Sequence, residues 1–156
     1  VVPELRREFG VPVVAIVRDG RYVVRSLMAR GCYQREGYPP IEADHIQGVE
    51  GRARLDWDTV SAFAKCCWYW ATTYRLLERQ NVPLYYLEKL NADYDYFEGL
   101  CDVLGLTVQQ GDWQQHAGKR TNVSVEDEGP PVWGAAQWAQ FGALAGDVQR
   151  RLGYPL

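Results

Sequence analysis

Buried strands that alternate with amphipathic helices predict an α/β fold for this chain of 156 residues. The segment 11–17, VPVVAIV, is a nearly continuous apolar run, which is typical of a strand covered on both faces in a parallel sheet. A helical pattern follows at 21–29, and a second short strand at 84–87 follows a long helix at 58–79. We therefore expect consecutive parallel strands joined by helices, in a single domain over residues 1–156.

The first elements are expected in the order helix, strand, turn and helix. A short helix is predicted at residues 4–9, because Pro3 suits a first helical turn and Gly10 ends the pattern. The first strand ends at Arg18, where the apolar run stops. The helix at 21–29 then shows one apolar face with helical spacing.

The middle and the end of the chain alternate between irregular and helical patterns. Residues 31–55 have no clear period, which predicts a long excursion of the kind that often carries function. The clearest helix follows at 58–79, where large apolar residues recur three and four positions apart. These residues are Phe63, Cys67, Trp70, Tyr74 and Leu77. Residues 91–93 begin a helix that stops at Gly105, and a last helix is expected at 138–152.

Composition is that of an ordinary globular protein. Hydrophobic residues make up 47% and charged residues 24% of the chain, and the net charge of −3 argues against a general nucleic-acid partner. The sequence shows no signal-peptide pattern and no apolar run for a membrane span, so we expect no membrane partner. The four cysteines form no CxxC pair. That spacing argues against a metal site. Cys66 and Cys67 are adjacent in a helical pattern, which favours buried thiols and a reducing, cytoplasmic compartment.

Arg18 is the first candidate for chemistry, because open α/β sheets bind their ligands where the strands end. The next helix begins shortly after it, so free N–H groups at the start of that helix are expected to face the same crevice. Ser26 lies on that helix, off its apolar face. A guanidinium, a hydroxyl and a helix amino end can converge on one phosphate. The alternative is that Arg18 pairs with an acid such as Asp19 and that Ser26 faces solvent.

The segment 11–28, VPVVAIVRDGRYVVRSLM, resembles the 3′-phosphate-binding segment of sulfotransferases that use 3′-phosphoadenosine 5′-phosphosulfate. In that family a buried strand ends in Arg, and a Ser farther along the next helix shares the 3′-phosphate. Arg18 and Ser26 stand at those two positions. Residues 84–106 are similar to the family's strand, its Tyr-Glu-Asp-Leu element and the helix that follows.

The resemblance implies a P-loop NTPase-like sulfotransferase fold, of which this chain carries the later parallel strands and helices. It implies transfer of a sulfuryl group from the nucleotide donor to a hydroxyl or amine of a small-molecule or glycan acceptor, with no metal. The family's sulfate-binding P-loop and its usual catalytic His and Lys lie upstream of the Arg–Ser segment. We therefore expect this chain to be a carboxy-terminal part, and its catalytic residues are not identified. Two alternatives stay open: a non-catalytic nucleotide-binding or interaction module, and a P-loop kinase-like phosphotransferase.

The chain departs from the family pattern at three places near these motifs. Gly20 stands where the family usually has Pro, and Tyr22 where it often has Asp. The Tyr-Glu-Asp-Leu element is Leu-Glu-Lys-Leu here, which puts Leu87 in the place of an aromatic residue. These departures predict a looser turn after the first strand and a changed surface for the adenine.

A basic pair and a histidine complete the candidates. The chain is polar from Leu106 to Asp127, and Lys119 and Arg120 lie within this stretch. Family members often bring a basic loop over the same phosphate, so the resemblance implies that role for this pair; the alternative is a solvated charged loop. His45 can act as a base or contact an acceptor, or it is simply exposed.

Overall fold

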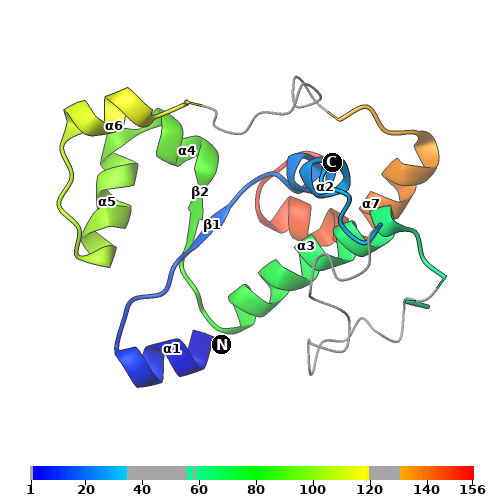
Figure 1. Cartoon of the computed structure of the whole chain (residues 1–156), viewed down its shortest axis with the longest axis horizontal. Coiled ribbons are helices and arrows are strands. Elements are labelled where there is room, and N and C mark those ends of the chain that lie inside the picture. The colour runs from blue at the N-terminus through cyan, green and yellow to red at the C-terminus, as the bar shows by residue number, and fades with distance from the viewer. Residues whose placement is uncertain (1, 35–55, 58, 120–130) are drawn as a thin grey trace. The chain divides into compact units, whose positions relative to one another are not determined.

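The computed structural model describes residues 2–34, 56–57, 59–119 and 131–156 (Figure 1). Contacts divide the chain into two compact units. The first takes in Val1–Arg18 and Leu77–Ser124, and the second Asp19–Leu76 and Val125–Leu156. Among the described residues, no helix is both long and apolar enough to cross a membrane.

The first unit contains a parallel pair of strands, β1 (Ala15–Val17) and β2 (Leu84–Tyr86). Their register places Ala15 opposite Leu84 and Val17 opposite Tyr86. A parallel pair cannot be joined by a tight turn, and here helices lie between the two strands in sequence. This arrangement agrees with the predicted α/β class.

The first strand is shorter and less covered than the apolar run 11–17 predicts. Pairing begins at Ala15, whose N–H donates to the carbonyl of Pro83 at 2.9 Å. Pro83 has no N–H to donate, and Asn81 has a left-handed φ of 50°. Val17 is fully buried, but Ile16 is 52% exposed. The expectation that both faces of this strand are covered is therefore wrong at Ile16.

Helix α1 (Val2–Phe9) begins two residues before its predicted start and ends, as predicted, before Gly10, whose φ is 61°. The guanidinium of Arg6 donates hydrogen bonds to the carbonyls of Gln80 and Asn81, at 3.0 and 3.3 Å. These bonds join the helix to the turn that precedes the second strand.

Within the described part of the first unit, three helices follow β2: α4 (Leu87–Ala92), α5 (Tyr94–Leu104) and α6 (Gln110–His116). Of these three helices, the sequence predicts only α5. The predicted second strand continues through Leu87, where the structure already begins α4. The residues of α6 were predicted to be part of a polar loop. Helix α6 is held by Trp113, whose indole N–H donates to the carbonyl of Leu90 at 2.9 Å. A single aromatic anchor of this kind leaves no periodic pattern in the sequence.

Helix α5 has the ends that the sequence predicts. The carboxylate of Asp93 accepts a hydrogen bond from the backbone N–H of Tyr96 at 3.2 Å, and Gly105 closes the helix with a φ of 69°. Asp93→Ala should lower the free energy of unfolding by about 1 kcal/mol, because it leaves a helical N–H without its cap. Urea denaturation measures this, with Asp102→Ala on the exposed face of the same helix as the matched control. An equal loss in both variants would contradict the capping role.

The second unit contains α2 (Gly20–Ala29), α7 (Ala135–Arg151) and α3 (Ala62–Arg79) except for the last three residues of α3 (Figure 1). Trp70 on α3 stacks on Phe141 of α7 with ring centroids 6.3 Å apart, and Tyr74 lies against the same indole at 5.3 Å. Trp70 is 2% exposed and Phe141 is fully buried. Packing of these rings is therefore a major part of the core of this unit.

The ends of α3 and α7 differ modestly from the predicted ranges. Helix α3 begins at Ala62 and not at residue 58, because Ser61 accepts a hydrogen bond through its hydroxyl from the N–H of Ala64 at 3.2 Å. Helix α7 begins three residues before its predicted start, and Gly153 follows its end with a φ of 79°. Both helices are otherwise confirmed.

Candidate functional site

Arg18 follows β1 directly, at the carboxyl edge of the parallel pair in the first unit. Its side chain is half-buried. Because the strands are parallel, the residues that follow Tyr86 leave the sheet at this same edge. Arg18 therefore lies at the carboxyl edge of a parallel pair of strands, as the sequence predicts, and this is the edge at which open α/β sheets bind ligands.

A second cation, Lys89, belongs to this edge, and the sequence analysis missed it. The ammonium of Lys89 lies 5.2 Å from the ring centroid of Tyr86 and 5.7 Å from that of Tyr96. The hydroxyl of Tyr96 accepts a hydrogen bond from the backbone N–H of Tyr86 at 3.2 Å. The rings of Tyr85 and Tyr96 lie 5.6 Å apart. The available signal was the Lys in the Leu-Glu-Lys-Leu element, where the family pattern has Asp.

The start of α2, in the second unit, is already occupied by the protein's own groups. The N–H of Gly20 donates to the side-chain oxygen of Gln149 at 3.0 Å, and that of Arg21 to the carboxylate of Asp19 at 2.9 Å. The next two N–H groups, of Tyr22 and Val23, donate to the backbone carbonyl of Asp19. The prediction that free N–H groups at this helix end meet a phosphate is therefore wrong. Asp19 is its N-cap, a role for which Asp is well suited.

Asp19 is a buried carboxylate that the protein neutralises itself. It is 4% exposed, and its Oδ2 lies 2.6 Å from Nη2 of Arg21. The side-chain amide of Gln149 donates to Oδ1 at 2.7 Å. Burial by itself raises the pKa of Asp19, but the hydrogen bonds from Arg21 and Gln149 outweigh it, so the pKa lies below its ordinary value. The hydrogen bond to Asp19 likewise raises the pKa of Arg21.

The remaining predicted site residues lie apart from this network or outside the described residues. Ser26 is half-buried on α2, in the second unit, whereas Arg18 belongs to the first, so their convergence on one phosphate stays a prediction. Lys119 is exposed, and its backbone N–H donates to the carbonyl of His116 at 3.1 Å. Arg120 and His45 lie outside the described residues.

The four cysteines are buried free thiols, which confirms the prediction for Cys66 and Cys67. Burial, together with the neighbouring Cys32, raises the pKa of Cys66 to about 12. Burial also raises the pKa of Cys67. These thiols are protonated at neutral pH and are poor nucleophiles there. Among the described residues, no group of three or more His, Cys, Asp or Glu side chains is placed to hold a metal ion.

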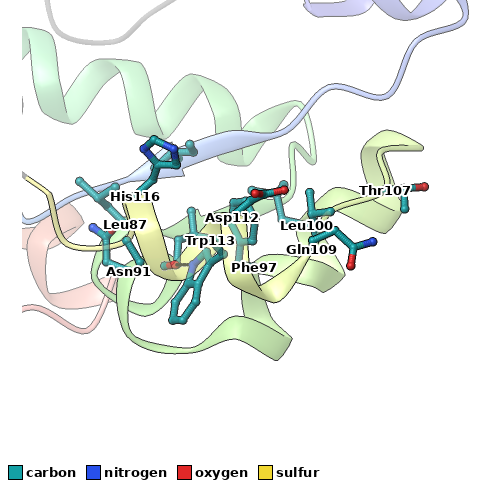
Figure 2. Close-up of a pocket in the computed structure, with 13 residues that line it drawn as sticks. Leu87, Asn91, Phe97, Leu100, Thr107, Gln109, Asp112, Trp113 and His116 are labelled. Carbon is teal, nitrogen blue, oxygen red and sulfur yellow. Dashed lines mark hydrogen bonds between the residues drawn. The ribbon is translucent and has the colours of Figure 1, made fainter.

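A cavity of about 410 Å³ lies within the first unit (Figure 2). Its walls come from β1, α4, α5, α6 and the segment that joins α5 to α6. Most of the lining side chains are apolar, and the polar ones include Asn91, Gln109, Asp112 and His116. Sequence reasoning missed this cavity, because α4 and α6 were not predicted.

Comparisons of the chain with protein-family models, with curated proteins and with solved structures gave no match. A functional hypothesis for the chain therefore depends on its motifs, on the carboxyl edge of the sheet and on the cavity.

Proposed function

We propose that this chain is part of a sulfotransferase-like protein that transfers a sulfuryl group from 3′-phosphoadenosine 5′-phosphosulfate to a hydroxyl or amine acceptor. In this proposal the chain supplies the contact to the 3′-phosphate of the donor. The observation that carries the proposal is the position of Arg18 directly after a strand, at the carboxyl edge of a parallel pair. The sulfotransferase-like segment around Arg18 and Ser26 supports it.

The charges around this edge favour an anionic ligand. Lys89 adds a second positive charge to the edge of the sheet, where the family pattern has an Asp. Two cations raise the local positive potential that attracts a phosphate.

Arg18 would bind the donor through charge-assisted hydrogen bonds to the 3′-phosphate, far from the bond that breaks. A complete enzyme also needs a base that activates the acceptor and cations that stabilise the charge developing on the bridging oxygen. The proposal assigns neither role to a described residue. Loss of Arg18 should therefore weaken binding of the nucleotide first, before it affects the chemical step.

Arg18→Ala should lower the affinity for adenosine 3′,5′-bisphosphate by about tenfold or more, because a charge-assisted hydrogen bond contributes at least ~1.4 kcal/mol. Binding of adenosine 5′-monophosphate, which lacks the 3′-phosphate, should change little. Isothermal titration of both nucleotides measures the difference. The matched control is Arg7→Ala, because Arg7 is an exposed arginine of the same unit.

Equal losses for the two nucleotides would count against the assignment of Arg18 to the 3′-phosphate. Stronger binding of ATP than of the 3′-phosphorylated nucleotide would favour a kinase-like phosphotransferase. Binding of the 3′-phosphorylated nucleotide without sulfuryl transfer by the full natural protein would identify a non-catalytic module.

A further inference from the structure

The cavity of the first unit has the dimensions of a small-molecule site. Its volume of about 410 Å³ falls within the range of roughly 300–1,000 Å³ that is typical of ligand pockets. Ile16 lines it from β1 and is 52% exposed, although it belongs to the strand with the most apolar sequence. A ligand in the cavity would cover this side chain and gain the free energy of burying it.

The walls of the cavity favour a hydrocarbon or aromatic body. Leu87 and Leu90 on α4, Phe97 and Leu100 on α5, and Trp113 on α6 contribute large apolar surfaces. The indole N–H of Trp113 already donates to the carbonyl of Leu90, so this group is not available to a ligand. A ligand therefore meets Trp113 as an apolar ring.

The charge of the cavity is negative and comes from one side chain. Asp112 is the one Asp, Glu, Lys or Arg among the described residues that line it. His116 lies one turn farther along α6, and Figure 2 shows both side chains on the same side of that helix. Asp112 is exposed, and its carboxylate accepts no hydrogen bond from, and forms no ion pair with, the other described residues. It is therefore available to a cationic group of a ligand.

We propose that this cavity binds a small aromatic or aliphatic amine. The hydrocarbon body lies against the apolar walls, and the ammonium group donates hydrogen bonds to the carboxylate of Asp112. An organic anion of the same shape is disfavoured, because its charge would approach this carboxylate without compensation. Arg18 and Lys89 do not line this cavity, so the proposal does not depend on the contact proposed for Arg18.

The test compares naphthylmethylamine with naphthylmethanol, which share one ring system and differ in the charged group. Both are titrated into the isotope-labelled full chain, and the indole N–H resonance of Trp113 reports binding by NMR. The amine should bind about fivefold more tightly than the alcohol, the difference expected for one partly exposed ion pair. Trp113→Phe identifies the resonance by its disappearance.

Two variants separate the charge of the cavity from its apolar walls. Asp112→Asn should bring the two affinities to within about twofold of each other, whereas Asp102→Asn, an exposed carboxylate on α5 outside the cavity lining, should leave the preference unchanged. Ala117→Leu adds three carbons to the wall and should weaken both probes alike. Far-ultraviolet circular dichroism checks that each variant folds.

Three outcomes would overturn the proposal. Equal binding of amine and alcohol to the unaltered chain would remove the role of Asp112. An equal effect of Asp112→Asn and Asp102→Asn would show a general surface charge and no site. Binding of neither probe at millimolar concentration would mean that the cavity does not take an aromatic amine.

Discussion

Asp19→Ala is expected to lower the free energy of unfolding of the second unit by about 3 kcal/mol, the range for breaking a buried ion pair by removing one partner. The substitution removes the acceptor for the guanidinium of Arg21, which is 17% exposed and would lose a partner at 2.6 Å. It also removes the acceptor for the amide of Gln149 and the cap of α2. A half-buried cation and several donors are then left unsatisfied.

The matched control for this prediction is Asp147→Ala, in the same unit. Asp147 pairs with Arg75 at 2.6 Å and with Arg151 at 2.9 Å, so it has ion-pair distances like those of Asp19. Its side chain is 48% exposed, however, and exposed ion pairs contribute about 0–1 kcal/mol. Urea denaturation of both variants measures the two losses. Comparable losses would show that the network around Asp19 is no stronger than a surface pair.

The lowered pKa of Asp19 also predicts how the stability of the Asp19→Ala variant depends on pH. A carboxylate whose pKa is lower in the folded than in the unfolded chain stabilises the fold at pH values above the unfolded-state pKa, about 3.9. This contribution is lost as the pH falls through the lower folded-state pKa. Asp19→Ala should therefore lose less stability than the unaltered chain between about pH 5 and pH 2. A parallel loss in the two proteins would contradict it.

The start of α2 shows which part of the site the sequence could predict. A short run of residues gives the strand end, the turn and the helix, because apolar periodicity and the Asp–Gly pair are local signals. Gln149 lies 130 residues from Asp19, and no local pattern predicts that its side chain binds the helix end. The hypothesis of free N–H groups was wrong because the neighbouring Asp19 accepts hydrogen bonds from three of them and the distant Gln149 accepts one from the fourth.

The cavity of the first unit likewise depends on contacts that local sequence patterns do not predict. Helix α5 could be predicted at both ends from Asp93 and Gly105, because caps act within one turn. Helix α6 depends on one tertiary hydrogen bond from Trp113, and the length of β1 depends on the backbone of residues opposite it. Contacts of this kind create the cavity, so its position could not be derived from periodicity.

Gly20→Ala is expected to lower the free energy of unfolding by about 2 kcal/mol, because a Cβ at this position would enter a filled part of the core. That Cβ would lie 2.7 Å from Cζ2 of the Trp70 ring, closer than such atoms approach in proteins. Trp70 cannot move aside easily, since it is 2% exposed and packed between Tyr74 and Phe141. The close approach also leaves no room for the Pro that stands here in the sulfotransferase segment that this sequence resembles. A proline would bring the same Cβ and would lack the N–H that donates to Gln149. The turn is therefore tightly packed, and the prediction of a looser turn is wrong.

The control for this prediction is Gly142→Ala in α7, where a Cβ would meet nothing within 4 Å. That substitution should raise the free energy of unfolding by about 0.5–1 kcal/mol, because alanine is more favourable than glycine in a helix interior.

A second test places Gly20→Ala in a Trp70→Phe background. The smaller ring should relieve the clash, and the substitution also removes an indole N–H that has no hydrogen-bond partner among the described residues. If the clash is the cause, Gly20→Ala costs at least about 1 kcal/mol less in this background than in the unaltered chain. Equal costs in the two backgrounds would place the strain elsewhere, in the backbone of the turn itself.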